Sequence, residues 1–308
     1  MKKLQVRDVY NKMGWFFCVL EGIMLFVQVL FIILGYLLKI DIEKNMNFLY
    51  IVSAVSYYGV AFPLFALCMS TLDGNVYNEK KPLGVLGFFK LFFISFALMN
   101  ITNFINVGFY GVFKLLTGHE MASNLDGVLT EVSVLMVLTT VVLAPVFEEL
   151  TFRYLALNKL RKYGDKTAIL VTAVLFGLFH MNFEQAIYAF AIGLVFGYVV
   201  CKTGRVVYTI LLHAMVNLCG GVVPLLVEQI DNPMVELIYT VLFFVFLIIG
   251  IVLFILNVKK IKFNQACEPA SHPVVSFFTS PGMLVFVITS ILVAFVTLIG
   301  QIITALFG

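Results

Sequence analysis

Uninterrupted apolar runs of about twenty residues recur along the whole chain, and this feature restricts its fold more than any other. A helix needs roughly 20 apolar residues to cross the ~30 Å hydrocarbon core of a bilayer. Such runs lie near 15–38, 48–71, 85–113, 128–147, 167–183, 186–201, 206–227, 234–257 and 282–305. Lipid offers no partners to backbone polar groups, so a spanning segment must satisfy them internally. The sequence therefore predicts an all-α, polytopic transmembrane helix bundle of about nine spans.

The composition supports contact with lipid. Charged residues make up 12% of the chain and hydrophobic residues 62%, whereas a soluble domain averages about 25% charged residues. The net charge of +3 is too small to indicate a nucleic-acid partner. The first apolar run is too long for a cleavable signal peptide, and we expect it to be a transmembrane helix. The run at 186–201 is short, so the count falls to eight if it does not cross independently.

Basic residues alternate between the predicted loops. Fifteen of the twenty Lys and Arg residues lie at the N-terminus and in every second loop. They are Lys2, Lys3, Arg7, Lys12, Lys80, Lys81, Lys159, Arg161, Lys162, Lys166, Lys202, Arg205, Lys259, Lys260 and Lys262. The opposite loops hold Lys39, Lys44 and Lys114 with the acids Glu120, Asp126, Glu184, Glu228 and Asp231. Cytoplasmic loops carry the excess of Lys and Arg, so we expect a cytoplasmic N-terminus. As a separate expectation, the membrane is a bacterial plasma membrane.

Seven ionisable residues fall within or at the edge of predicted spans, where each costs at least ~2.5–3.5 kcal/mol at the bilayer centre. They are Glu21, Lys90, Glu148, Glu149, Arg153, His180 and His213. Glu21 and Lys90 are isolated, and we expect structural roles for both, with Lys90 reaching the cytoplasmic surface through its long side chain. The other five fall in three short segments of the central region.

The first of these segments is APVFEELTFRYLALNKL at 144–160. Glu149 and Arg153 are four residues apart on one helix and can pair on one face. Glu148 points about 100° away from Glu149 and has no such local partner. This asymmetry predicts a structural Glu149 and a Glu148 that serves as a general base. A salt-bridged helix end at the cytoplasmic interface is the alternative interpretation.

The other two segments carry the histidines. His180 follows Phe176 by four residues, and His213 precedes Asn217 by four. A buried His/Asn pair can tie helices together, or it can donate hydrogen bonds to a developing oxyanion.

Depth favours a common site. At 1.5 Å per residue, Glu148, His180 and His213 lie ~16, ~21 and ~12 Å from the nearest cytoplasmic basic residue. Three helices thus bring a Glu and two His to similar depth. Pro145, just before the acids, can kink its helix and make room for water.

The three segments form an ordered pattern. EELTFR (148–153) matches EExxxR, FGLFH (176–180) matches FxxxH, and HAMVN (213–217) matches HxxxN. In this order they resemble the CAAX-processing and bacteriocin-processing (CPBP, or Abi) family, which includes the Rce1-type CAAX prenyl endopeptidases. The stretch FAIGLVFGYVVCKTG (190–204) also looks like the family. The resemblance covers about 128–227.

The resemblance implies an intramembrane endopeptidase, a hydrolase that cuts a membrane-associated or lipid-modified protein or peptide. Glu148 and His180 would activate a water molecule, and His213 and Asn217 would stabilise the oxyanion. Glu149 and Arg153 would hold their helix in place. The chain then divides into 1–127 with three N-terminal spans, 128–227 as the CPBP-like catalytic core, and 228–308 with the C-terminal spans and a cytoplasmic linker at 258–281.

The family has been described both as metal-dependent and as glutamate proteases. A divalent ion such as zinc would be held by Glu148, His180 and His213. We favour no metal and no other cofactor, because Asn217 is a poor ligand and zinc sites use three His, Cys or carboxylate ligands. Expected partners are membrane lipid and a protein or peptide substrate, either prenylated or a bacteriocin leader.

Two other function classes fit the same features. A proton-coupled transporter also combines many spans with buried charges, although the sequence has no repeated halves with paired broken helices. A non-catalytic membrane protein of bacteriocin immunity or of the cell envelope is the second alternative.

Overall fold

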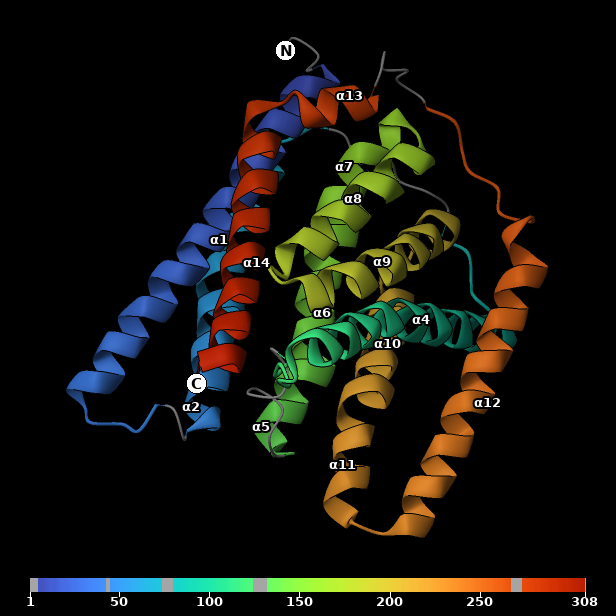
Figure 1. Cartoon of the computed structure of the whole chain (residues 1–308). Helices are drawn as coiled ribbons and strands as arrows, with labels where there is room; N and C mark the ends of the chain where they lie inside the picture. Colours follow the sequence, from blue (N-terminus) through green and yellow to red (C-terminus); the bar gives the residue numbers. More distant parts are fainter. Residues whose placement is uncertain (1–4, 43–44, 74–79, 124–131, 267–272, 308) are drawn as a thin grey trace. The chain divides into compact units, whose positions relative to one another are not determined.

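The fold is entirely helical in the part of the chain that the computed structural model describes, which is residues 5–42, 45–73, 80–123, 132–266 and 273–307 (Figure 1). The predicted all-α class is confirmed, because no strand occurs in these ranges. Four charged residues from the orientation argument, Lys2, Lys3, Lys44 and Asp126, lie outside the described residues.

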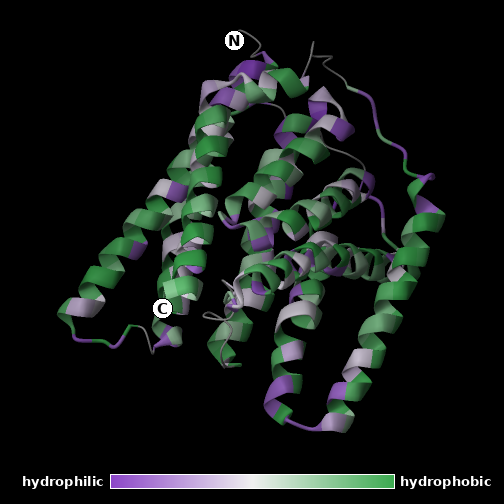
Figure 2. Cartoon of the chain, in the orientation of Figure 1, coloured by the Kyte–Doolittle hydropathy of each residue, from purple (hydrophilic) through white to green (hydrophobic). Residues whose placement is uncertain are grey.

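Within those ranges, eight helices are long and apolar enough to cross a membrane. They are Val6–Leu37, Met46–Ser70, Val85–Thr117, Val134–Tyr163, Phe183–Thr203, Val207–Ile230, Pro233–Val258 and Pro281–Phe307. Figure 2 shows hydrophobic residues along the lengths of these helices and hydrophilic residues gathered near their ends. The chain is thus a multi-pass integral membrane protein, and its orientation stays a prediction.

The short helix is not the one that the sequence indicated. The run at 186–201 belongs to α9 (Phe183–Thr203), which has 21 residues. The run at 167–183 instead yields α8 (Asp165–Phe179), whose 15 residues span only about 22 Å. Helix α8 stops because Met181 has a positive φ of 51° and the side chain of Asn182 caps the next helix.

The helices form two compact units, each built from non-contiguous segments. Unit 1 comprises residues 1–77, 132–168 and 264–288, and unit 2 comprises 78–131, 169–263 and 289–308. Unit 1 contains α1 (Val6–Leu37), α2 (Met46–Ala54), η1 (Val55–Ala61), α3 (Phe62–Ser70), α5 (Val134–Val137), η2 (Leu138–Leu143), α6 (Ala144–Glu149), η3 (Leu150–Leu157), α7 (Asn158–Leu160), η4 (Arg161–Tyr163) and α13 (Pro273–Phe278). Unit 2 contains α4 (Val85–Thr117), α9, α10 (Val207–Asn217), η5 (Leu218–Val222), α11 (Val223–Ile230) and α12 (Pro233–Val258). Helices α8 and α14 (Pro281–Phe307) contribute to both units.

The core of unit 1 is built around Phe17 of α1. Its ring packs against the rings of Phe65, Phe152 and Phe286, with centroid distances of 4.9, 5.5 and 5.3 Å. Each of these four side chains is almost completely buried. Because Phe152 lies inside EELTFR, this aromatic cluster anchors the helix that carries the acidic motif.

The core of unit 2 includes the contact between α4 and α12. Phe246 packs edge-on against Phe93 and Phe92, with centroids 5.0 and 6.2 Å apart. One turn further along α12, Gly250 lies so close to α4 that an added Cβ would overlap the carbonyl oxygen of Phe93. Towards the end of α12, Lys90 Nζ donates to Asn257 Oδ1 at 2.7 Å. This bond gives the ammonium group of Lys90 a hydrogen-bond acceptor within unit 2.

We predict that Gly250→Ala lowers the thermal stability of the protein, because overpacking a close helix contact costs roughly 1–3 kcal/mol. Gly108→Ala on α4 is the matched control, since no atom lies within 4 Å of its added Cβ. A Gly→Ala change without a clash stabilises a helix by up to about 1 kcal/mol. Thermal unfolding in detergent measures both variants, and a Gly250→Ala protein as stable as Gly108→Ala contradicts this packing.

Candidate active site

The acidic motif lies on a helix whose hydrogen-bonding pattern changes repeatedly. The π-helical segment η2 is followed by α6, which begins with Ala144 and Pro145 and ends at Glu149. A second π-helical segment, η3, then carries the remainder of EELTFR. Proline lacks an amide hydrogen and clashes with the preceding turn, so the ladder around Pro145 departs from the α pattern. Such π segments occur frequently at functional sites.

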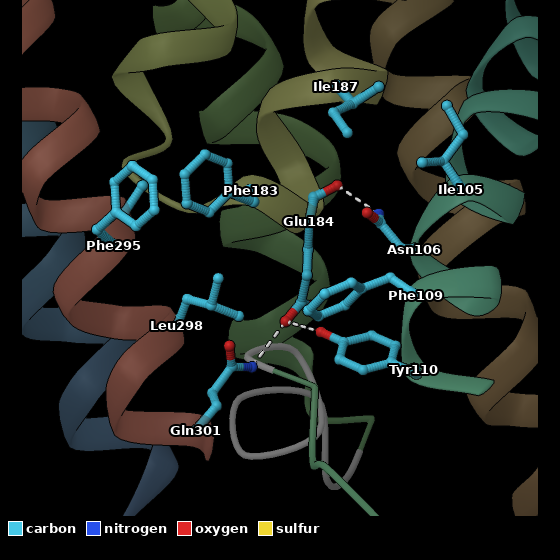
Figure 3. A pocket seen from close by; sticks show the side chains of 11 residues that line it. Ile105, Asn106, Phe109, Tyr110, Phe183, Glu184, Ile187, Phe295, Leu298 and Gln301 are labelled. Atoms are coloured by element: carbon cyan, nitrogen blue, oxygen red, sulfur yellow. Dashed lines mark hydrogen bonds between the residues drawn. The ribbon is translucent and has the colours of Figure 1, made fainter. Parts of the chain in front are cut away.

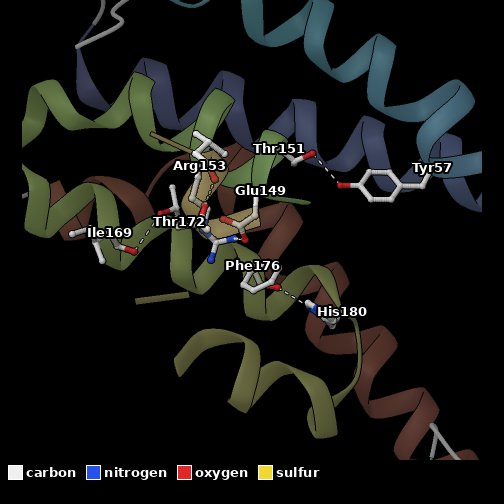
Figure 4. A network of polar contacts seen from close by, with 10 residues as sticks. Tyr57, Glu149, Thr151, Arg153, Ile169, Thr172, Phe176 and His180 are labelled. Atoms are coloured by element: carbon white, nitrogen blue, oxygen red, sulfur yellow. Dashed lines mark hydrogen bonds and ion pairs between the residues drawn. The ribbon is translucent and has the colours of Figure 1, made fainter. Parts of the chain in front are cut away.

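Glu149 and Arg153 form an ion pair inside unit 1. Arg153 Nη1 lies 3.0 Å from Glu149 Oε1, and both residues are 0% exposed (Figure 4). The i,i+4 spacing had predicted this pairing. An opposite charge in direct contact offsets part of the cost of burying each charge, so the ion pair accounts for two charges within a transmembrane helix.

Glu148 has a different environment, since it is only half-buried. The preceding residue, Phe147, stacks on Tyr58 with centroids 4.6 Å apart and meets Phe62 edge-on at 4.9 Å. Tyr57 and Tyr58 both lie within electrostatic range of the Glu148 carboxyl group. Glu148 therefore directly follows a residue that packs against Tyr58 of η1 and Phe62 of α3.

Tyr57 also touches the motif directly. Its hydroxyl group lies 2.9 Å from Thr151 Oγ1, inside EELTFR, and both residues are buried (Figure 4). Sequence reasoning missed Tyr57 and Tyr58. Two adjacent tyrosines in the middle of an apolar run were a usable signal, because a buried phenol needs a hydrogen-bond partner.

The two histidines meet around one aromatic ring in unit 2. The ring of Phe176 lies 5.1 Å from the His180 ring and 5.8 Å from the His213 ring, centroid to centroid, with edge-on geometry in both cases. His213 is 3% exposed and also packs against Phe196 at 5.6 Å. Residues from α8, the α8–α9 turn and α10 thus converge at Phe176.

His180 lies in the turn after α8 and not within a helix, where the sequence placed it. Its Nδ1 atom lies 2.8 Å from the Phe176 carbonyl oxygen (Figure 4). A carbonyl oxygen only accepts hydrogen bonds, so Nδ1 carries the proton and Nε2 is the basic nitrogen of the neutral ring. Asn182 Nδ2 donates to the His180 carbonyl oxygen at 2.8 Å, which secures the turn.

Two glycines allow α9 to approach α8 closely. An added Cβ on Gly193 would lie 3.2 Å from Ala173 and 3.3 Å from Phe176, and one on Gly197 would lie 3.2 Å from Ile169. Small residues four apart are a recurrent helix-contact pattern in membranes. The stretch 190–204 therefore helps to position Phe176, and its GxxxG spacing was the signal available in the sequence.

The predicted site residues divide between the two units. Glu148, Glu149 and Arg153 belong to unit 1, whereas His180, His213 and Asn217 belong to unit 2. Asn217 is half-buried at the end of α10, one turn after His213, and the π-helical segment η5 follows it directly. The candidate donors for a divalent ion are Glu148, His180 and His213, and no group of three such side chains forms a metal cluster among the described residues.

Comparison with known proteins shows which family the central segment of the chain is similar to. A family model described as "Type II CAAX prenyl endopeptidase Rce1-like" matches residues 130–219, which contain all three motifs. A Bacillus subtilis (strain 168) protein named "Putative membrane peptidase YdiL" is 25% identical over 146 residues, covering 46% of this chain and 57% of that relative. No solved structure matches the chain.

These matches agree with the three motifs read from the sequence. Over its central segment, the chain is similar to the Rce1-like CAAX prenyl endopeptidases and to a membrane peptidase relative. The matched residues 130–219 lie within the region 128–227 that the motifs delimited. The chain's match spans a little over half the length of its Bacillus relative.

We predict that the two adjacent glutamates differ in their effect on stability. Glu149→Gln leaves Arg153 as a buried charge without its ion-pair partner, which costs about 3–5 kcal/mol. Glu148→Gln alters a half-buried side chain and leaves the unfolding temperature nearly unchanged. Thermal unfolding of the purified protein measures both variants.

A double variant provides the control for this prediction. Replacing both partners, as Glu149→Leu with Arg153→Met, recovers stability lost in the single variant because apolar side chains substitute well for a buried ion pair. Equal destabilisation by Glu148→Gln and Glu149→Gln contradicts the different environments of the two acids.

Proposed function

We propose that this protein is an intramembrane endopeptidase that hydrolyses a peptide bond in a membrane-associated or lipid-modified protein or peptide. The observation that carries the proposal is the convergence of His180 and His213 on Phe176, within a segment that matches CAAX prenyl endopeptidases. The ion-paired Glu149, which leaves its neighbour Glu148 in a distinct and more open environment, supports it.

In the proposed mechanism, Glu148 and His180 activate a water molecule. The Glu148 carboxylate accepts a proton from the water, and His180 Nε2 orients it as a hydrogen-bond acceptor. The resulting hydroxide attacks the carbonyl carbon of the scissile peptide bond. Glu148 then passes this proton to the leaving amine as the C–N bond breaks, which yields a carboxylic acid and an amine and returns Glu148 to its carboxylate form.

His213 and Asn217 take the role of oxyanion donors. The imidazole N–H of His213 and the amide N–H of Asn217 are one turn apart on α10, so both can address the same oxygen. Preorganised donors of this kind stabilise developing negative charge strongly, because water is excluded from the site. The buried position of His213 supports this role.

The proposal also covers the cofactor, the substrate and the location. We assign glutamate-type chemistry without a metal. The substrate is a membrane-associated or lipid-modified protein or peptide. The Bacillus relative supports the bacterial plasma membrane as the location.

We predict that Glu148→Ala and His180→Ala each abolish substrate cleavage, with a rate loss of about 10²–10⁴-fold per group. Peptidomes of cells that express wild-type or variant protein identify the substrates and measure the loss. His119→Ala and Glu228→Gln are matched controls, because both residues are exposed and lie outside the three motifs. Full cleavage by the Glu148→Ala and His180→Ala proteins contradicts the proposal, whereas rescue of a cellular phenotype by the Glu148→Gln protein favours a non-catalytic role.

We also predict that strong chelators leave the activity of the purified protein unchanged. Incubation with EDTA or 1,10-phenanthroline, followed by elemental analysis of the same sample, tests this point. Loss of activity that zinc restores, together with a stoichiometric metal in the wild type and its absence in His180→Ala, would establish a metalloprotease instead.

A further inference from the structure

Unit 2 contains a buried acid, Glu184, that the proposed mechanism does not use. Glu184 is the second residue of α9, and it is 8% exposed. Its Oε1 atom accepts hydrogen bonds from the Tyr110 hydroxyl group and, at 2.8 Å, from Gln301 Nε2 (Figure 3). Its Oε2 atom accepts from Ser123 Oγ at 2.6 Å, and its carbonyl oxygen accepts from Asn106 Nδ2 at 2.8 Å. Residues from α4, α14 and the segment after α4 thus surround one carboxylate.

Hydrogen-bond donors meet both carboxylate oxygens of Glu184. Tyr110, Ser123 and Gln301 each donate to one of these oxygens, and a carboxylate oxygen can accept more than one such bond. The N-terminus of a helix also favours negative charge, because the backbone amides of its first turn point outward. Glu184 lies in that turn of α9. The three hydrogen bonds and the N-terminus of α9 together hold the Glu184 carboxylate in a fixed position.

The carboxylate forms part of the wall of a cavity of about 250 Å³. The remaining wall is mainly apolar and aromatic, and Figure 3 shows Phe109, Phe183 and Phe295 around the acid. Aromatic faces attract cations in addition to providing apolar contact. A cavity of this kind suits a small cationic group attached to an apolar body.

The rim of the cavity faces outward. Ile105 and Phe109 on α4 are 56% and 47% exposed, and Phe295 on α14 is 49% exposed. These residues lie on helices long and apolar enough to span the membrane, so lipid chains contact such side chains. Tyr110 lies seven residues from the end of α4, or about 10 Å along the axis. The cavity therefore lies near a helix end, where lipid head groups meet the hydrocarbon.

The positive charge of Lys114 suits the phosphate group of a phospholipid. Lys114 follows Tyr110 by one turn on α4 and pairs with Glu120 at 2.5 Å, with side chains that are 60% and 79% exposed. The carboxyl pKa of Glu120 is lowered by this hydrogen bond from Lys114. An exposed ion pair contributes little to stability, so the lysine can exchange its carboxylate for a phosphate.

We propose that this cavity binds an amine-bearing phospholipid such as phosphatidylethanolamine. The ammonium group binds Glu184, the phosphate lies near Lys114, and the acyl chains lie along the exposed faces of α4 and α14. This site is separate from the His180 and His213 cluster, and it does not depend on proteolytic activity.

Competitive lipid binding tests the proposal. Purified full-length protein is mixed with equimolar phosphatidylethanolamine and phosphatidylcholine of identical acyl chains, and bound lipid is counted by native mass spectrometry. Phosphatidylcholine is the matched comparator, because it has the same net charge but no N–H group. We expect roughly tenfold enrichment of phosphatidylethanolamine, since hydrogen bonds to a charged acceptor are strong. Equal occupancy by the two lipids in the wild type overturns the proposal.

Two variants distinguish a loss of lipid recognition from a loss of folding. Glu184→Gln abolishes the preference, whereas Glu228→Gln, an exposed acid on α11 of the same unit, retains it. Because Glu184 joins several elements, Ala294→Leu serves as a second variant that narrows the cavity and leaves the carboxylate in place. It also abolishes the preference. An unchanged preference in both variants overturns the proposal, as does Glu184-dependent binding of a lysine-bearing peptide without lipid enrichment.

Discussion

The ion pair between Glu149 and Arg153 determines how the helix of the acidic motif is oriented. Neither charge is stable alone in an apolar interior, so each must face the other from the buried side of the helix. Both residues are inaccessible to solvent, and Phe152 between them packs into the Phe17 cluster. With that face held, the neighbouring Glu148 must lie on a different face. The chemical role proposed for Glu148 therefore depends on a contact that it does not make itself.

Departures from α-helical geometry concentrate near the same residues. The π-helical segments η1, η3 and η5 contain or adjoin Tyr57, Glu149 and Asn217, and η2 lies one helical segment before Glu148. A π turn places an additional residue in one turn of the helix and so changes the direction of the side chains that follow. The departure near Glu148 also follows from Pro145, which cannot donate a hydrogen bond within the helix. Local helix distortion thus accompanies each of the two parts of the proposed site.

The sequence was sufficient to predict the helical class and the membrane location, because both follow from the length of the apolar runs. It was also sufficient to predict the pairing of Glu149 with Arg153, because that follows from their spacing along one helix. It also placed Glu148, His180 and His213 at similar depth on separate helices; both histidine rings contact Phe176, and a common site with Glu148 stays a prediction. It did not reveal that α8 is too short to span the membrane on its own. Hydropathy registers apolar length, whereas the end of α8 depends on the positive φ of Met181 and the cap of Asn182. Tyr57 was missed for a similar reason, because its contact with Thr151 joins positions 94 residues apart.

The turn between α8 and α9 links the two sites of unit 2 within a few residues. Asn182 Nδ2 donates to the carbonyl oxygen of His180, and Asn182 Oδ1 accepts from the backbone N–H of Gln185 at 2.8 Å. The local geometry around His180 and the first turn of α9, which carries Glu184, therefore depend on the same amide side chain.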